Sequence, residues 1–277
     1  MEEKILRVGH SPDADDAFMF YGLACEAVTI EGFRIEHVME DIESLNQRAV
    51  TGELEVTAVS AHAFPLLADR YWIMASGASM GEGYGPVVVA KTPLTLADLD
   101  GKKVATPGPM TTARLLADIW IDGAEKIDMD FDRIIDAVLA GEVDAGVIIH
   151  EGQLTYGGQG LQKVVDFGEK WEQEHGLPLP LGLDLVRRDL GRELAGKISA
   201  AIKASIKHGY ENQDKSIPYA LQFGRGLDQE TGSKFVKMYV SELTIDMGEQ
   251  GRKGLETLFR LGHEKGIIGT VPAIELV

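Results

Sequence analysis

The residue best suited to acid–base chemistry in this sequence is His150. It ends the apolar run VDAGVIIH, residues 143–150, and Glu151 follows it directly. An imidazole accepts a proton near neutral pH, as a general base must, and the carboxyl end of a strand is where ligands bind in α/β folds. A lone histidine is more often a structural residue, so a core histidine at the end of a buried strand is the alternative interpretation. The strand end and the neighbouring Glu151 favour the general base, with His10 as the one rival histidine.

A turn in the stretch VATPGPMTTA, residues 104–113, carries Thr111 and Thr112 at the start of a predicted helix. Unpaired backbone N–H groups and the positive end of a helix dipole would face a cleft there, with the two hydroxyls as further donors. A carboxylate or phosphate would fit such a site. The alternative, that one threonine only caps the helix, is equally supported.

Two more strand ends carry small polar or acidic side chains. Ser60 follows VTAV, where it would either hydrogen-bond a ligand or cap a turn. The loop at residues 9–18 carries Ser11 and three aspartates, Asp13, Asp15 and Asp16. We expect Ser11 or an aspartate to cap a helix that starts near Phe18. The loop lacks the glycine and the distal glutamate of a calcium loop, so we predict no metal.

Alternating strand and helix patterns must position these residues. Strand patterns occupy residues 5–9, 56–60, 86–91, 102–108 and 143–150. Helical patterns occupy residues 43–53, 92–101, 111–120 and 131–141, and the chain is mostly helical after residue 189. This order predicts an α/β fold with mainly parallel sheets and a ligand site beyond the carboxyl ends of the strands.

Two similar segments predict where the chain crosses between two lobes. PVVVAKTPLTLADL and LPLGLDLVRRDLGRELAGK each place Pro or Gly before an apolar strand, then a basic residue, then a helix. If both strands cross, residues 1–91 and 184–277 form the first lobe and residues 92–183 the second, with a cleft between them. The alternative is that these are two ordinary strand–helix units.

Composition excludes several classes of function. A formal net charge of -17 without basic clusters argues against nucleic acid and anionic membranes as partners. No apolar run reaches the roughly 18 residues of a membrane span, and the start MEEKILRVGH shows no signal-peptide pattern, so we expect a cytoplasmic protein. Cys25 is the single cysteine and is expected to be a buried, inert thiol. Motifs of serine hydrolases, P-loop NTPases and common zinc enzymes are absent.

Six stretches resemble one known family in their order and spacing as well as their content. They are SPDADDAFMFYGL, EDIESLNQRAVTGELEVTAVS, GYGPVVVAK, VATPGPMTTA, GEVDAGVIIHEGQLTY and GLPLPLGLDLVRRDLG. Along nearly its full length the chain resembles 1,4-dihydroxy-6-naphthoate synthase of the futalosine route to menaquinone.

The resemblance implies a two-lobed, periplasmic-binding-protein-like α/β fold of type II with the ligand cleft between the lobes. It implies a lyase that converts cyclic dehypoxanthine futalosine, a small-molecule carboxylate, into 1,4-dihydroxy-6-naphthoate with loss of the ribose-derived fragment, and no metal or organic cofactor. His150 matches the family's proton acceptor. The implied substrate contacts are Ala58, Val59, Ser60, Thr111 and Thr112. We expect Ser11 and Ser60 to orient substrate oxygens; no oligomeric state is predicted.

The first loop departs from the family's pattern. Many members carry Cys-Pro-Asn-Asp-Thr where this chain has Asp13-Ala14-Asp15-Asp16-Ala17, so the hydrogen-bond donors of the loop differ. Two other functions stay open on the sequence. One is chorismate dehydratase of the same pathway, which would eliminate water from a smaller substrate, and the other is a non-catalytic protein that binds a small anion.

Overall fold

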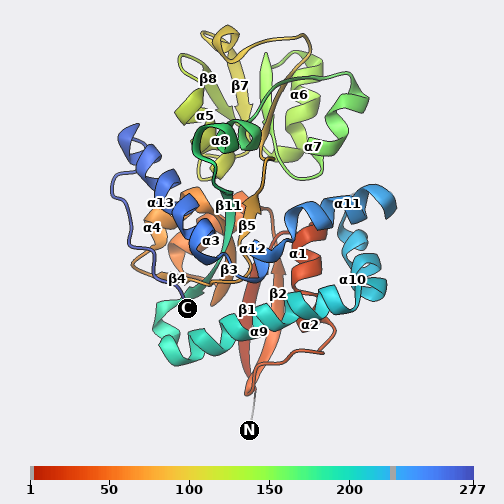
Figure 1. Cartoon of the computed structure of the whole chain (residues 1–277), viewed down its shortest axis with the longest axis vertical. Helices are drawn as coiled ribbons and strands as arrows, with labels where there is room; N and C mark the ends of the chain where they lie inside the picture. The colour runs from red at the N-terminus through yellow and green to blue at the C-terminus, as the bar shows by residue number, and fades with distance from the viewer. Residues whose placement is uncertain (1–2, 225–228) are drawn as a thin grey trace.

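The computed structural model describes residues 3–224 and 229–277, and its strands form two separate sheets (Figure 1). The larger sheet has the order β2, β1, β3, β11, β4, with β5 also paired to β11. Its strands are β1 Lys4–His10, β2 Phe33–Met39, β3 Val56–Ser60, β4 Tyr71–Ile73, β5 Ser79–Gly81 and β11 Leu179–Arg187. Because β1 and β3 are parallel, the strand ends at His10 and Ser60 lie at the same edge.

The smaller sheet has the order β10, β6, β9, β7, β8. Its strands are β6 Val87–Ala90, β7 Lys103–Thr106, β8 Glu125–Asp128, β9 Ala145–Ile148 and β10 Gln162–Asp166. β7 and β9 are parallel, so the chain leaves both strands at one edge, toward Thr111 and His150. The α/β class is confirmed, but both sheets are mixed rather than mainly parallel. β6 runs antiparallel to β9 and β10. β11 runs antiparallel to β3, β4 and β5. The reason is that the chain enters β6 and β11 from the other sheet.

Helices cover both faces of each sheet (Figure 1). They are α1 Ala14–Met19, α2 Tyr21–Ala24, α3 Ile42–Thr51, α4 Phe64–Leu67, α5 Thr112–Trp120, α6 Ile134–Ala140, α7 Gly152–Thr155, α8 Phe167–His175, α9 Arg192–Glu211, α10 Gln213–Ala220, α11 Gln229–Tyr239, α12 Glu242–Ile245 and α13 Gly248–Glu264. Short 3-10 helices lie at Ala61–Ala63, Leu96–Leu99, Phe131–Arg133, Tyr156–Gln159, Arg188–Leu190 and Leu221–Phe223. On one face of the larger sheet Val8 and Val186 share a core with Phe18 of α1 and Ile202 of α9. This packing fixes the start of α1 against the strand ends.

Local signals explain why the predicted helices form where they do. Asp41 caps α3 by accepting hydrogen bonds from the N–H groups of Glu43 and Ser44, and Gly52, with a φ of 74°, ends it. Gly141, with a φ of 77°, ends α6 in the same way. Because these caps are local, the ends of the helices near the site can be predicted from the sequence alone.

Two predicted helices differ from the structure. α1 starts at Ala14 rather than near Phe18, because Asp13 is its N-cap and accepts a hydrogen bond from the N–H of Asp16. Residues 92–101 form only the 3-10 helix Leu96–Leu99, which is a single turn that begins with a capping box.

The predicted burial of Cys25 is wrong. Its side chain is exposed because α2 ends at this residue and turns it away from the core.

The lobe boundaries of the sequence, residues 1–91 with 184–277 and 92–183, remain a proposal. The sheets favour moving both boundaries toward the amino terminus. β6 pairs with β9 and β10 of the smaller sheet, and the whole of β11 pairs with strands of the larger one. We therefore propose that the crossings lie between β5 and β6 and between β10 and β11.

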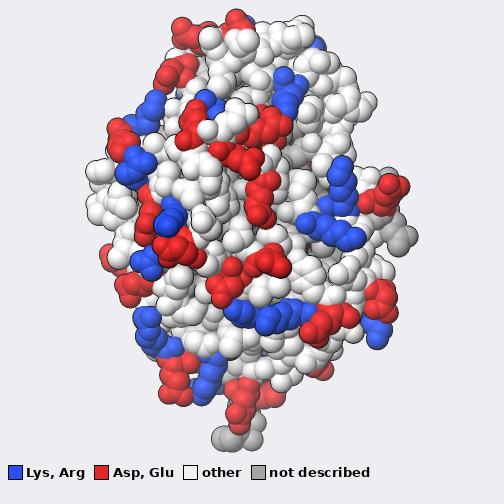
Figure 2. Space-filling model, viewed as in Figure 1, with Lys and Arg blue, Asp and Glu red and all other residues white. Residues whose placement is uncertain are grey.

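The surface carries both signs of charge. On the face shown in Figure 2, basic side chains are interspersed with acidic ones. Along the helices of the chain, some basic side chains form ion pairs with acidic ones, such as Lys197 with Glu193 and Arg260 with Glu264, both at 2.8 Å. Among the described residues, no helix has both the length and the apolar character needed to cross a membrane.

Candidate active site

A cavity lies between the two sheets and is lined from both sides. Its empty space, counting the part open to solvent, is about 710 Å³. All seven residues singled out from the sequence line it: Ser11, Ala58, Val59, Ser60, Thr111, Thr112 and His150. The rival histidine, His10, is not among the lining residues; it is buried, and its Nε2 lies 2.9 Å from Nδ1 of His37. The structure therefore brings the predicted residues together in one place.

His150 projects into this cavity from the end of β9. Its backbone is left-handed, with a φ of 54°, so the chain turns sharply as it leaves the strand. Its Nδ1 lies 3.1 Å from Oδ2 of Asp13, and its ring packs edge-on against Phe131 with 5.0 Å between centroids. Nε2 has no hydrogen-bond partner among residues 3–224 and 229–277. One ring nitrogen is thus held by a carboxylate, and the other is available to a ligand.

Asp13 is the partner that holds His150. Its side chain is 2% exposed, and its Oδ1 also accepts a hydrogen bond of 3.2 Å from the backbone N–H of Asp16. Burial alone would raise the pKa of Asp13, but the hydrogen bond and the charge of His150 outweigh burial and hold that pKa well below its ordinary value. An ionised Asp13 assigns the N–H of His150 to Nδ1 and leaves a lone pair on Nε2.

The sequence did not identify Asp13 as this partner. In the sequence, the neighbouring Glu151 favours the general base, whereas in the structure His150 pairs with Asp13, 137 positions away. The available signal was three carboxylates directly after β1, which we interpreted as helix caps. Asp13 caps α1 with one carboxyl oxygen and pairs with His150 through the other.

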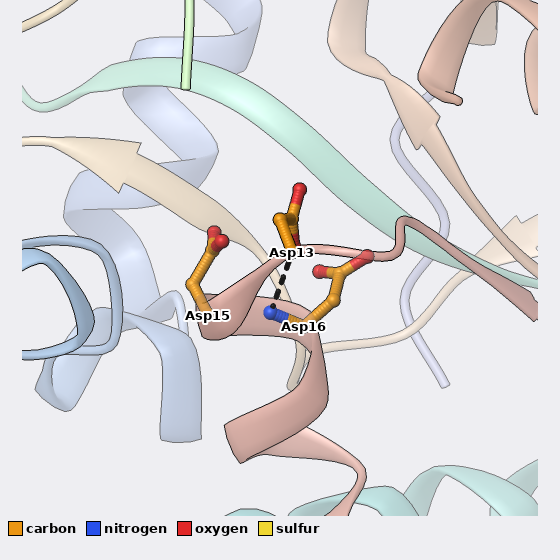
Figure 3. Close-up of side chains that lie close together, drawn as sticks. All are labelled: Asp13, Asp15 and Asp16. Atoms are coloured by element: carbon orange, nitrogen blue, oxygen red, sulfur yellow. Dashed lines mark hydrogen bonds between the residues drawn. The ribbon is translucent and has the colours of Figure 1, made fainter. Parts of the chain in front are cut away.

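Three further carboxyl groups line the same cavity: Asp15, Asp16 and Asp184 (Figure 3 shows the first two with Asp13). Asp16 Oδ2 accepts a hydrogen bond of 2.5 Å from the N–H of Ser11. Burial first, and then the charge of Asp13, raises the pKa values of Asp15 and Asp16 well above their usual range. Burial raises the pKa of Asp184 to about 8. This wall of the cavity therefore combines acids whose protonated form is favoured by burial with Asp13, whose ionised form is favoured by His150.

Three of these carboxylates could converge on a cation. Ligand oxygens of Asp13, Asp15 and Asp16 lie within 4.8 Å of one another. In the structure, Asp13 uses both carboxyl oxygens, one for the N–H of Asp16 and one for His150, and Asp16 accepts a hydrogen bond on Oδ2.

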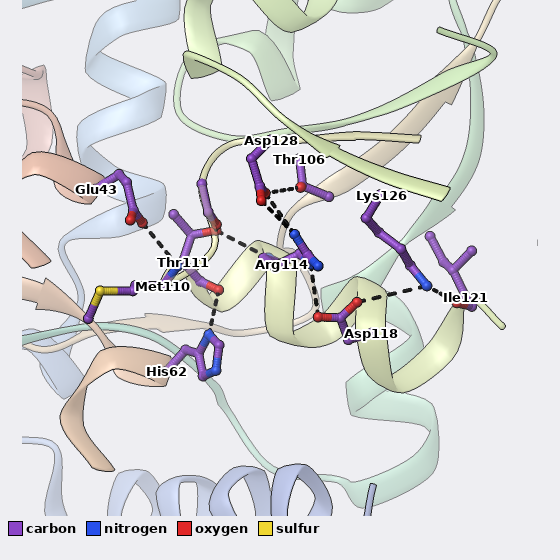
Figure 4. Close-up of polar contacts among 11 residues, drawn as sticks. Glu43, His62, Thr106, Met110, Thr111, Arg114, Asp118, Ile121, Lys126 and Asp128 are labelled. Carbon is purple, nitrogen blue, oxygen red and sulfur yellow. Dashed lines mark hydrogen bonds and ion pairs between the residues drawn. The ribbon is translucent and has the colours of Figure 1, made fainter. Parts of the chain in front are cut away.

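The threonine turn combines the two roles that the sequence left open. Thr111 is the N-cap of α5: its hydroxyl accepts from the N–H of Arg114 at 3.2 Å and donates to the carbonyl of Gly108 at 2.8 Å (Figure 4). The hydroxyl of Thr112 donates to the carbonyl of Leu181 at 2.8 Å. Within the described chain, the backbone N–H groups of Thr112 and Ala113 have no acceptor. The donors left for a ligand are therefore backbone N–H groups at the start of α5 rather than the two hydroxyls.

Contacts across the cavity hold this turn against the larger sheet. The N–H of Met110 donates to Oε2 of Glu43 at 3.1 Å, and Nδ1 of His62 lies 3.2 Å from the carbonyl oxygen of Thr111 (Figure 4). The hydrogen bond from Thr112 to Leu181 of β11 is a third such link. These polar contacts close the cavity on this side, and any movement that widened the cavity here would break them.

The two serines keep hydroxyl groups for a ligand. The amide of Asn46 accepts from the N–H of Ser60 at 2.8 Å and donates to its hydroxyl at 3.1 Å, so the Ser60 O–H is still able to donate. The hydroxyl of Ser11 is buried and has no partner in the part of the chain that the structure describes. Ala58 and Val59 supply the apolar floor beside Ser60.

The raised pKa of Asp184 predicts a pH-dependent stability difference from the Asp184→Asn variant. The folded protein keeps the Asp184 proton up to about pH 8, whereas the unfolded chain loses it near pH 4. Stability from this group is therefore complete below about pH 4 and is lost as the pH rises toward the folded pKa. We expect the Tm of Asp184→Asn minus that of the parent to grow by at least about 3 °C between pH 5 and pH 8.5 in thermal melts. A difference that stays constant over this range would contradict the raised pKa.

Comparison with known proteins places this geometry among its relatives. The menaquinone biosynthesis family matches residues 6–264. Proteins called 1,4-dihydroxy-6-naphthoate synthase from Thermus thermophilus and Streptomyces coelicolor are 38% and 34% identical; the alignments cover 96% and 97% of this chain and 97% and 96% of theirs. Among solved structures, protein AF1704 of Archaeoglobus fulgidus is 49% identical with a TM-score of 0.91, over 95% of this chain and 98% of that one. The alkanesulfonate-binding protein SsuA of Xanthomonas axonopodis pv. citri, bound to MOPS, has a TM-score of 0.72 at 15% identity, over 100% and 97% of the two chains, and shows the same binding-protein fold.

Proposed function

Because the chain belongs to the menaquinone biosynthesis family, with relatives that are 1,4-dihydroxy-6-naphthoate synthases, we propose that it converts cyclic dehypoxanthine futalosine into 1,4-dihydroxy-6-naphthoate with His150 as the general base. The single observation that carries the role of His150 is its pairing through Nδ1 with the buried Asp13, which leaves Nε2 of this cavity-lining residue without a partner among the described residues. A base must present an unprotonated nitrogen to its substrate, and this arrangement does so.

In the proposed mechanism, Nε2 of His150 removes an acidic proton from the bound substrate. The electron pair left by this proton expels the ribose-derived fragment, which departs with the electrons of the broken carbon–carbon bond and takes up a proton, and aromatisation of the remaining rings drives the reaction. Asp13 stabilises the imidazolium that forms, since a carboxylate beside a protonated imidazole lowers its energy. Contact between the lobes excludes water from the reacting atoms.

The substrate carboxylate is placed at the start of α5 in this proposal. The N–H groups of Thr112 and Ala113 supply donors, and the helix dipole adds a partial positive charge. Ser11 and Ser60 face the same cavity and would orient hydroxyl or carbonyl oxygens. We further propose a lyase that acts in the cytoplasm, with neither nucleic acid nor membrane as a partner. The single cysteine and the net charge of -17 support this placement.

A charge at the start of α5 tests the position of the carboxylate. Aspartate and asparagine both cap helices well, so Thr111→Asp and Thr111→Asn should both fold. Only the first adds a negative charge, and like charges a few ångströms apart repel by several kcal/mol at intermediate dielectric, so we expect KM to rise at least ~10-fold in Thr111→Asp. Thr111→Asn should stay within about threefold of the parent, since it makes no such repulsion. Equal KM values for the two variants in steady-state assays would place the carboxylate elsewhere.

The reaction itself is tested by incubating the parent with cyclic dehypoxanthine futalosine at pH 7 and detecting dihydroxynaphthoate by liquid chromatography and mass spectrometry. Product formation is the expected result. A well-folded parent that forms no product would refute the assignment, and chorismate would then distinguish a dehydratase from a protein that only binds a small anion.

A further inference from the structure

Asp184 is a buried acid for which the proposed mechanism has no use. It lies on β11 opposite Ala58 of β3, it is 1% exposed, and it lines the cavity. Neither of its carboxyl oxygens has a hydrogen-bond partner within residues 3–224 and 229–277. A buried polar group without a partner costs free energy, so such a group in a ligand cavity points to a contact with the ligand.

The backbone beside Asp184 leaves space for its carboxyl group. Gly77 has a φ of 87°, and a Cβ added there would lie 2.0 Å from Oδ2 of Asp184. A side chain at residue 77 would therefore displace the carboxyl from its present position. Because glycine has no side chain, the carboxyl group of Asp184 can occupy this position at the cavity wall.

The surroundings of Asp184 favour its protonated form. Among the described residues that line the cavity, none is a lysine or an arginine. The titratable groups that share the cavity with it are Asp13, Asp15 and Asp16 from the first loop and α1, His150 from the end of β9, and Tyr239 of α11. The negative charge of Asp184 repels that of Asp16 and raises the pKa of Asp16. Burial raises the pKa of Asp184 to about 8. At pH 7 it carries a proton and offers one donor and one acceptor.

We propose that Asp184 binds, as a neutral carboxylic acid, a hydroxyl group of the ribose-derived part of the substrate. The proposal rests on the function proposed above. An alcohol also has one donor and at least one acceptor, so it complements a protonated carboxyl on both counts. The substrate carboxylate then binds at the start of α5 and the hydroxyl-bearing part at Asp184 of β11.

Binding without turnover tests this contact. Calorimetric titration of cyclic dehypoxanthine futalosine into His150→Gln measures the Kd of a protein that retains the whole substrate site except the base. Adding Asp184→Leu is expected to weaken binding at least ~10-fold, the effect of losing a buried hydrogen bond. Adding Asp184→Asn should change the Kd less than about threefold, because an amide keeps a donor and an acceptor. Asp166→Asn, which removes a capping carboxylate of α8 away from the cavity lining, is the control and should leave the Kd unchanged.

The pH dependence gives a second measurement that also applies if Asp184→Leu does not fold. With the pKa of Asp184 at about 8, its protonated fraction falls about tenfold from pH 7 to pH 9, so the Kd of His150→Gln should rise by this factor. The double variant with Asp184→Asn should show no such rise. The other cavity acids titrate in both proteins, so the comparison isolates Asp184.

Several results would overturn the proposal. They are equal Kd values with and without Asp184→Leu, the same pH dependence after Asp184→Asn, or substrate binding that requires Mg²⁺ in chelator-treated protein. Product formation by the parent together with any of these would leave the proposed function standing. Asp184-dependent binding without turnover by the parent would refute the function alone. No binding by the parent or by His150→Gln would refute both.

Discussion

Replacing His150 with glutamine is expected to lower kcat for cyclic dehypoxanthine futalosine by about 10³-fold or more. Loss of a general base alone removes about 10²–10⁴ in rate, and here it also leaves Asp13 buried without its partner. Substrate contacts elsewhere in the cavity are intact, so KM should change little. The measurement is product formation at pH 7 and the pH profile of kcat, each compared with the parent.

His10, a buried histidine at the end of a strand, provides the matched comparison. His10 ends β1 and contacts His37 rather than the cavity, so His10→Gln should keep turnover within about threefold even if its Tm falls. Near-normal turnover with an unchanged pH profile in His150→Gln would show that His150 is not the base. Loss of activity in His10→Gln alone would transfer the role to His10.

Replacing Asp13 with asparagine is expected to lower kcat by about 10²–10⁴-fold while the protein stays folded. An asparagine still caps α1 toward the N–H of Asp16, so the local structure is retained. Its amide does not provide the anion that holds the N–H on Nδ1 of His150, and in a serine protease the equivalent change lowers turnover about 10⁴-fold. The imidazolium formed in the reaction also loses its neighbouring negative charge, and the loss of turnover is measured as kcat and its pH profile in steady-state assays.

The control for Asp13→Asn is a carboxylate with the same capping role away from the cavity. Asp166 caps α8 by accepting hydrogen bonds from the N–H groups of Gly168 and Glu169, and Asp166→Asn should leave kcat and its pH profile unchanged. If Asp13→Asn matched this control in both quantities, Asp13 would be a helix cap and no more.

The sequence by itself determined several of the strands that carry the site and the places where they end. Val56–Ser60, Lys103–Thr106 and the strand before His150 were readable because short apolar runs bounded by turns depend on neighbouring residues only. Because parallel strands end at one edge, the residues that follow them were predicted to meet, and all seven predicted site residues line one cavity. Helix ends such as Gly52 and Gly141 were predictable for the same local reason.

Only the tertiary structure decided which side chains pair and which are buried. Asp13 and His150 are far apart in the chain, and the spacing of residues along the sequence does not encode a contact made when two sheets pack around a cavity. The same holds for Asp184, whose sequence LGLDLV reads as an ordinary strand until Gly77 and Asp16 are brought against it. Protonation of a buried acid depends on every group that surrounds it, so the chemistry of this site follows from packing, while its location follows from the order of strands and helices.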